Sequence, residues 1–180
     1  MKIAVFGGSF DPPHCGHEMI VNEALKSLHV DKLFIVPTFL NPFKKEVFAS
    51  CETRLRWLKK VFTCKEVEIV DFEVKQKRAV ASIETIEYLK TKYDLEKIYL
   101  IVGADNLLTL ESWHRYNELK NMVEFVIVTR DEIVLPKELK KLQINAKISS
   151  SKLRSNMSKS FLPHKIANEV IEFYKEQNGK

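Results

Sequence analysis

The feature that most constrains this chain is its first segment, MKIAVFGGSFDPPHCGH, in which an apolar run meets two glycines, a turn and two histidines. The run from Lys2 to Phe6 has the length of a buried parallel strand, and Gly7 and Gly8 interrupt it. An amphipathic helix is predicted from about Cys15. A helix that follows a strand in this way offers free backbone N–H groups and a positive dipole end to an anion. The segment therefore predicts a phosphate site.

His14 and His17 fall beside this predicted helix start, where they would contact the phosphate. The residues alone leave other interpretations open. A glycine pair after a strand is common in α/β proteins, and the two histidines with Asp11 and Cys15 are possible metal ligands. Zinc sites usually need three or four well-spaced ligands, and no partner cluster occurs elsewhere in the sequence. We therefore expect no metal site built from protein ligands.

Length and composition favour a single domain over residues 1–180. The chain has 180 residues, of which 45% are hydrophobic, so it can bury a full core without disulfides. Its three cysteines form no CxxC pair, which favours a reducing compartment and a cytoplasmic location. Neither a signal pattern nor a membrane span is expected.

The charge balance is mildly basic, with 29 Lys and Arg residues against 24 Asp and Glu residues. The basic residues are interleaved with glutamates rather than gathered in one run. A small polyanionic substrate explains such an excess as well as DNA or RNA does. We expect no nucleic-acid partner, although a basic nucleic-acid-binding module remains a non-enzyme alternative.

Apolar runs alternate with helical patterns along the whole chain. Strands are predicted at Lys2–Phe6, Lys32–Val36, Val67–Phe72, Lys97–Val102, Glu124–Thr129 and, weakly, Asn145–Ile148. The irregular segments between elements are Thr38–Ser50, Lys75–Ala81 and Asp131–Gln143. Several strand runs are continuous rather than alternating, which is typical of parallel sheets covered on both faces. The predicted fold is a doubly wound, mostly parallel α/β sheet, which binds ligands outside the carboxyl ends of its strands.

The motif GGSFDPPHCGH resembles the GGxFDPxHxGH signature of the HxGH nucleotidyltransferases, in the form of the nicotinate-nucleotide adenylyltransferase family. The resemblance covers nearly all of the chain and implies a Rossmann-like nucleotidyltransferase fold. It also implies that His14 and His17 contact the ATP phosphates and stabilise the charge that develops at the α-phosphate. Further ATP contacts are implied for Gly7, Gly8, Ser9 and Phe10.

A later segment, ISSSKLR, resembles the ISSTxIR segment with which the family holds the ATP phosphates. The matching residues are Ser149, Ser150, Ser151 and Arg154. On a helix that starts at these serines, Arg154 lies on the same side as Ser151, and its guanidinium fork suits phosphate oxygens. Taken alone, the serines are also ordinary capping residues.

The segment GADNLLTLESWHRYNEL resembles the GaDxLxxLxxWxxWexL pattern of the family, with Tyr116 at the position of the second Trp. The resemblance implies that Asp105 contacts the nucleotide ribose and that Trp113 faces the pyridine ring. From the residues alone, Asp105 is an equally good helix N-cap, and Trp113 is a core or interface aromatic. The polar neighbours of Trp113 favour a position at an edge.

Two more segments bear on the mononucleotide. RAVASIETI resembles the family's SYTIDTL, which puts Ser82 at a nucleotide-contacting position; Ser82 is also a good N-cap for the helix that follows. PTFLNPFKK resembles a loop of the form NPxHK, with Phe43 in place of the histidine. In the family the lysine of this loop reaches the phosphates, so Lys44 is expected to act both in catalysis and at the mononucleotide.

The resemblance implies that the adenylyl group of ATP is transferred to nicotinate mononucleotide, giving deamido-NAD and pyrophosphate. Mg²⁺ is the expected cofactor, bound mainly through the ATP phosphates. A phosphate nucleophile with a second pKa near ~6 is largely ionised at neutral pH, so no general base is required. The enzyme alternatives are transfer to nicotinamide mononucleotide or to phosphopantetheine, and the other non-enzyme alternative is a nucleotide sensor. The sequence does not indicate an oligomeric state.

Overall fold

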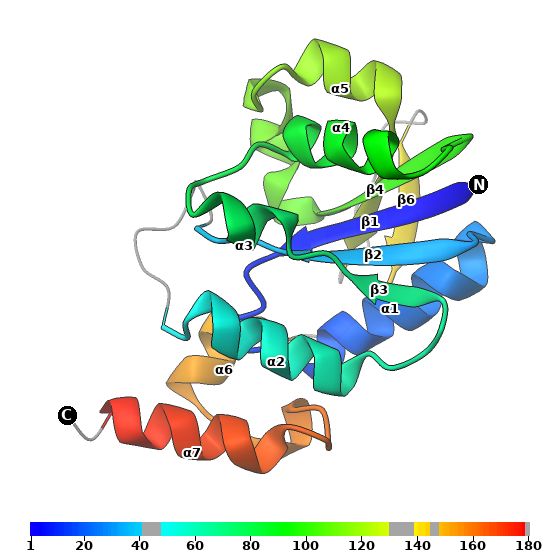
Figure 1. Cartoon of the computed structure of the whole chain (residues 1–180). Coiled ribbons are helices and arrows are strands. Elements are labelled where there is room, and N and C mark those ends of the chain that lie inside the picture. The colour runs from blue at the N-terminus through cyan, green and yellow to red at the C-terminus, as the bar shows by residue number, and fades with distance from the viewer. Residues whose placement is uncertain (41–47, 130–138, 145–147, 179–180) are drawn as a thin grey trace.

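A parallel sheet forms the middle layer of the molecule, in a computed structural model that describes residues 1–40, 48–129, 139–144 and 148–178 (Figure 1). Its strands are β1 (Lys2–Gly8), β2 (Lys32–Pro37), β3 (Val67–Ile69), β4 (Lys97–Gly103), β5 (Glu124–Thr129) and β6 (Lys140–Gln143). Their order in the sheet is β3-β2-β1-β4-β5-β6, and every neighbouring pair is parallel. The predicted doubly wound parallel fold is confirmed.

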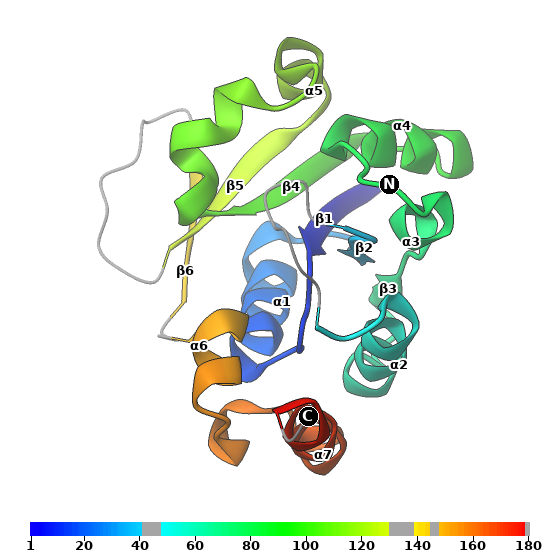
Figure 2. The ribbon, with the colours of Figure 1, turned by 90° about the vertical axis from the view of Figure 1, so that its left-hand side faces the viewer.

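Helices cover both faces of this sheet (Figures 1 and 2). They are α1 (Cys15–Leu28), α2 (Cys51–Val61), α3 (Phe72–Gln76), α4 (Ser82–Lys92), the 3₁₀ helix η1 (Ala104–Ser112) and α5 (Tyr116–Met122). Successive side chains of β1 point to opposite faces, so Ala4 and Phe6 pack in the core with α1 while Ile3 and Val5 pack in the core with α4. Burial on both faces explains why the strand is a continuous apolar run.

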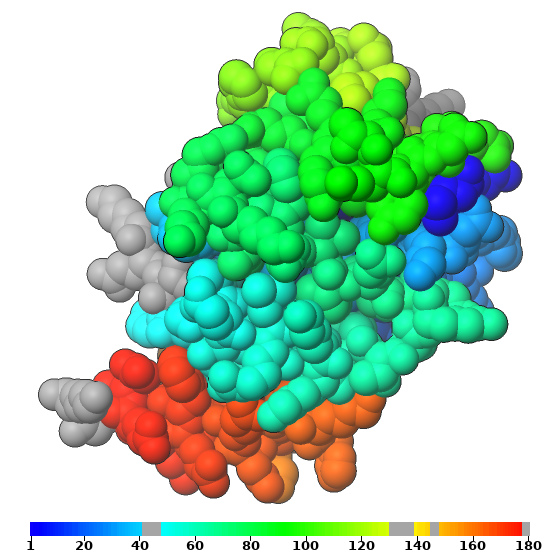
Figure 3. All heavy atoms as spheres, viewed as in Figure 1, coloured from blue at the N-terminus to red at the C-terminus, as the bar shows by residue number. Residues whose placement is uncertain are grey.

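The C-terminal helices form a further layer outside α2. They are α6 (Ser150–Ser155), the 3₁₀ helix η2 (Lys159–Phe161) and α7 (Ala167–Asn178). Trp57 of α2 is fully buried in a separate apolar cluster with Leu153 of α6 and Val170 of α7. Figure 3 shows α7 lying along the base of the molecule beneath α2. No helix in these described segments is long and apolar enough to cross a membrane.

The sheet changes direction between β1 and β4. From β1 the chain builds outward through β2 and β3, then crosses to β4 on the other side and builds outward again to β6. The loops that leave two such neighbouring strands diverge, and the crevice between them is the usual ligand site of this architecture. Gly7 and Gly8 end β1, and Gly103 ends β4. The two glycine segments singled out in the sequence therefore meet at this crevice.

The third strand is shorter than predicted. β3 ends at Ile69, and Phe72, expected to be its last residue, begins α3. Helix α3 also takes in Lys75 and Gln76, which belong to a segment predicted to be irregular. The apolar pattern continues through Phe72, and periodicity alone does not separate the end of a short strand from the start of a short helix.

The last strand lies earlier than predicted. β6 covers Lys140–Gln143, inside a segment expected to be a loop, while Ile148 lies outside any strand and residues 145–147 lie outside the described segments. Among the described residues β6 pairs only with β5, and within β6 only Leu142 is buried. An edge strand needs few apolar side chains, so KKLQ lacks the run that marks the central strands.

Candidate active site

Two cavities open at the carboxyl ends of β1 and β4, and Gly7, Gly103 and Asn106 line both of them. The first, called here the tryptophan cavity, has a volume of about 260 Å³. Its lining includes Glu73, Ala81, Ser82, Ser112, Trp113 and His114. The second, the histidine cavity, has a volume of about 560 Å³. Its lining includes Ser9, Phe10, His14, His17, Asp105 and the three serines 149–151. The shared residues allow a two-ended ligand to occupy both.

The two histidines stack on each other at the start of α1. His14 is the N-cap residue and is only 2% exposed, and the two ring centroids lie 3.7 Å apart. The backbone N–H of His14 donates a hydrogen bond of 3.1 Å to Nδ1 of His17. Because Nδ1 accepts this bond, the ring hydrogen of a neutral His17 resides on Nε2. The local structure thus fixes which nitrogen of His17 is the donor.

Small and aromatic neighbours hold this stack in place. A Cβ atom on Gly16 would lie 3.0 Å from atoms of the His14 ring and from Cγ2 of Ile148, so a side chain there would crowd both. The buried ring of Phe10 meets the His17 ring edge-on, with centroids 4.8 Å apart. Phe10 has a left-handed φ of 49°, which is uncommon for a bulky residue. The small residue between the two histidines of the HxGH motif therefore also serves packing, because it leaves room for the stacked rings.

A buried arginine organises the loops behind the histidines. Arg54 of α2 is 1% exposed, and its guanidinium donates to the carbonyl oxygens of Ser9 at 2.7 Å and Thr38 at 2.8 Å. It also donates to the carbonyl oxygens of Ala49 at 3.1 Å and Phe39 at 3.2 Å. One side chain thereby joins the loop after β1, the loop after β2 and the segment that enters α2.

Asp11 complements this arginine from the loop after β1. Its carboxylate is 3% exposed and accepts hydrogen bonds from the backbone N–H groups of Phe48 at 2.9 Å and Ala49 at 3.0 Å. The hydroxyl of Tyr174, from α7, donates to the same carboxylate. Burial and the neighbouring Asp11 raise the pKa of Tyr174, so this hydroxyl remains a donor. Burial lowers the pKa of Arg54, and Asp11 opposes that shift.

The serine segment lines the histidine cavity. Ser149 caps α6, its Oγ accepting from the backbone N–H of Lys152 at 3.3 Å. Ser150 donates from Oγ to the carbonyl oxygen of Pro12 at 3.0 Å, which fastens the start of α6 to the loop that leads to His14. Ser151 completes the set of serines that line the cavity.

Arg154 lies beside Ser151, as its spacing predicts, and donates to its Oγ at 3.3 Å. Its guanidinium also donates to the backbone carbonyl of Asp11 and lies over the Phe48 ring, 4.5 Å from the centroid. The side chain therefore holds the loop after β1 and does not line either cavity in the described structure. Lys44 and Phe43 lie outside the described residues.

Ser82 and Trp113 both line the tryptophan cavity, whereas Asp105 lines the histidine cavity beside the shared Gly103. Trp113 is half-buried between exposed neighbours, in agreement with the predicted edge position. The two N-cap predictions are wrong. Ser82 is the first residue of α4, whose N-cap is Ala81, and Asp105 lies in the first turn of η1, whose N-cap is Gly103. Each element starts one or two residues earlier than the capping pattern indicates.

Sequence reasoning did not select Arg54, Tyr174 or Glu73. A signal exists for Arg54, because a charged residue at helical spacing from Trp57 and Leu58 lies on the buried face of α2. Tyr174 and Glu73 carry no such signal, since the partner of each lies on another element: Asp11 in the loop after β1 and Thr85 on α4.

The fold and the paired cavities define a nucleotide-binding α/β protein, and comparison with known families agrees. The Cytidylyltransferase-like family model matches residues 5–156. A solved structure of the nicotinic acid mononucleotide adenylyltransferase of Plasmodium falciparum, complexed with NaAD, has a TM-score of 0.76 at 20% identity and covers 97% of both chains. At this identity, the likeness shows a shared fold.

Relatives with higher sequence identity to this chain define its family more closely. The probable nicotinate-nucleotide adenylyltransferase of Sulfurimonas denitrificans is 50% identical, covering 99% of this chain and 97% of its own. That of Nitratiruptor sp. is 49% identical over 97% of this chain and 99% of its own. That of Campylobacter fetus is 47% identical over all of both chains. The chain belongs to the nicotinate-nucleotide adenylyltransferase family, whose members are nucleotidyltransferase enzymes.

The hydrogen bond from Tyr174 to Asp11 can be tested by substitution. Tyr174→Phe should lower the free energy of unfolding by about 1.5–3 kcal/mol, because a buried carboxylate loses a donor. The control is Tyr88→Phe, since the Tyr88 ring stacks on Phe72 and its hydroxyl has no hydrogen bond to the described residues. The control should change this free energy by less than about 0.5 kcal/mol. Urea denaturation measures both, and equal losses would contradict the role of Tyr174.

Proposed function

We propose that this chain transfers the adenylyl group of ATP to nicotinate mononucleotide, forming deamido-NAD and releasing pyrophosphate. The observation that carries this proposal is the pair of adjoining cavities that share Gly7, Gly103 and Asn106. The reaction needs two nucleotides held end to end, and two cavities with common lining residues meet that requirement. The Sulfurimonas denitrificans and Nitratiruptor relatives, which are 50% and 49% identical to this chain, are named for the same reaction and support the proposal.

In this proposal, ATP occupies the histidine cavity and the mononucleotide occupies the tryptophan cavity. The serines at the start of α6 and the loop from Gly7 to Phe10 contact the ATP phosphates. The half-buried indole of Trp113 faces the pyridine ring, and Ser82 contacts the mononucleotide. Asp105, on the histidine side of the shared Gly103, contacts ribose where the two nucleotides meet.

The chemistry is an in-line displacement at the α-phosphorus of ATP. A phosphate oxygen of the mononucleotide forms the new bond, and the bond from the α-phosphorus to pyrophosphate breaks. The nucleophile is already ionised, so the protein's task is to position both partners and to stabilise the growing negative charge. His17 donates from Nε2, and the N-terminus of α1 adds the positive end of its dipole.

Arg154 and Lys44 complete the proposed set of catalytic groups, together with His14 and His17. Through its bonds to Asp11 and Ser151, Arg154 brings positive charge to the phosphate side of the site while holding the loop after β1. His14 orients His17 through its backbone N–H and its stacked ring. The contact of Lys44 with the phosphates stays a prediction.

The donor set of the histidine cavity fits a cation held chiefly by substrate phosphates. Asp105 is the one carboxylate lining it in the described segments, where no group of three His, Cys, Asp or Glu side chains gathers. We propose Mg²⁺ as this cation, bound mainly through the ATP phosphates. When bound, Mg²⁺ supplies positive charge to the phosphates.

We also propose that residues 1–180 act as one domain in the cytoplasm, in keeping with the free thiols of Cys15, Cys51 and Cys64.

The substrate proposal is tested by measuring pyrophosphate release from ATP with nicotinate mononucleotide, nicotinamide mononucleotide and phosphopantetheine in turn. The acid mononucleotide should give the highest kcat/KM. Preference for the amide form would correct the substrate. Release with neither pyridine mononucleotide would overturn the proposal, and binding of nucleotide without turnover would favour a sensor.

His17→Ala should lower kcat by about 10²-fold or more, because the transition state loses a charge-stabilising donor. The matched control is His164→Ala, since His164 is an exposed histidine in the turn before α7 and lines neither cavity. The control should retain wild-type kcat in the same assay. A His17→Ala variant with wild-type turnover and an intact fold by circular dichroism would contradict the role of His17.

A further inference from the structure

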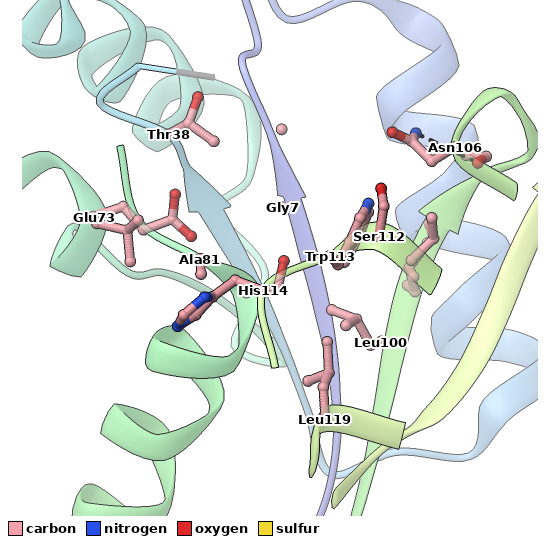
Figure 4. A pocket seen from close by; sticks show the side chains of 16 residues that line it. Gly7, Thr38, Glu73, Ala81, Leu100, Asn106, Ser112, Trp113, His114 and Leu119 are labelled. Carbon is pink, nitrogen blue, oxygen red and sulfur yellow. Dashed lines mark hydrogen bonds between the residues drawn. The ribbon is translucent and has the colours of Figure 1, made fainter. Parts of the chain in front are cut away.

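Glu73 brings an unmatched carboxylate oxygen to the tryptophan cavity. It lies on α3, is only 5% exposed and lines the cavity. The hydroxyl of Thr85 donates to its Oε1 at 2.7 Å. Its Oε2 is buried and has no hydrogen-bond partner among the described residues. Figure 4 shows the carboxyl group turned from α3 toward the cavity. A buried polar atom left without a partner is costly, so this oxygen points to a ligand.

The opposite side of the same cavity holds a second unmatched atom. Nε1 of Trp113 is buried and has no hydrogen-bond partner in the described segments (Figure 4). Apolar side chains, including Val80, Leu100 and Leu119, also line the cavity. A flat ring with a polar substituent suits such a cavity, because the walls take the ring and the unmatched atoms take the substituent.

The charged state of Glu73 is disfavoured where it stands. Burial raises the pKa of Glu73 to about 7, with Glu84 of α4 acting in the same direction and the Thr85 hydrogen bond opposing. Glu84 is itself paired with Arg78. His114, from the turn after η1, is the other titratable side chain that lines the cavity in the described structure. The protonated form of Glu73 is therefore populated near neutral pH.

We propose that Glu73 is a specificity-determining residue, whose protonated carboxyl group donates a hydrogen bond from Oε2 to the ring carboxylate of nicotinate mononucleotide. This inference rests on the proposed function. A Glu73 that is ionised in the free enzyme takes one proton from solvent when this substrate binds, since two adjacent carboxylates share a proton rather than both ionise. Nicotinamide mononucleotide carries an amide instead, whose N–H donates to ionised Glu73, so it binds without proton uptake.

The test is the ratio of kcat/KM for the acid mononucleotide to that for the amide mononucleotide, measured across pH. The two substrates share their phosphate and ATP, so the ratio isolates the pyridine end. In the wild-type enzyme the ratio should fall about tenfold between about pH 7.5 and about pH 8.5 as Glu73 loses its proton. Glu73→Gln donates from an uncharged amide, so it should retain activity with the acid within about threefold near pH 6.5 and show a constant ratio.

Two further variants separate hydrogen bonding from structure. Glu73→Ala should lower kcat/KM for the acid mononucleotide by about 10-fold or more, because the donor is lost. Glu87→Gln, on the same α4 that carries Thr85, changes a carboxylate paired with Arg115 and should keep the wild-type pH profile of the ratio.

Each outcome decides between the two proposals. If neither pyridine mononucleotide is a substrate, the proposed function fails and the role of Glu73 fails with it. If either is a substrate but the ratio is independent of pH in the wild type, or changes equally in Glu73→Gln, only the role of Glu73 is wrong.

The melting temperature tests the raised pKa of Glu73 independently of activity. Because the pKa of Glu73 is raised on folding, wild-type stability should fall relative to Glu73→Gln as pH rises from about 5 to about 7.

Discussion

The buried guanidinium of Arg54 is the interaction on which the rest of the site depends. A charged group this deep in a protein is costly unless its hydrogen-bonding capacity is satisfied. Here the partners are four backbone carbonyls from three segments, with the Asp11 carboxylate nearby. A hydrogen bond to the guanidinium holds each of these carbonyl oxygens. Tyr174 extends the same network to α7, which explains why a helix remote from both cavities bears on the loop that leads to His14.

A loop fixed in this way arranges donors before any substrate arrives. His17 receives a hydrogen bond on Nδ1 from the backbone of His14, and Gly16 leaves room for the stacked rings. Donors that are already oriented need not reorganise when charge develops, which is the main source of catalysis in phosphoryl-type transfer. The tryptophan cavity follows a different principle, because Glu73 and Trp113 leave polar atoms unmatched for the ligand to complete. In the proposed function, the histidine cavity stabilises charge and the tryptophan cavity selects the substrate.

More of the fold than of the site could be predicted from the sequence. Continuous apolar runs located the central strands because both faces of the sheet are buried, and the glycines of β1 and β4 located the crevice. Edge strand β6 escaped detection because only Leu142 is buried. In the site, short sequence motifs identified His14, His17 and the three serines, all of which line one cavity. The guanidinium of Arg154 meets the carbonyl of Asp11, and Arg54 reaches three segments, through contacts between residues far apart in the chain. No local pattern encodes such contacts.

In the proposed complex each cavity holds one of the two nucleotides. A crystal structure of this chain with deamido-NAD tests that assignment most directly. We expect the pyridine ring against Trp113, with its carboxylate at Oε2 of Glu73, the adenylyl half in the cavity lined by His14 and His17, and the linking phosphates beside the shared glycines. Adenine in the tryptophan cavity, or dinucleotide bound away from the ends of β1 and β4, would contradict the account.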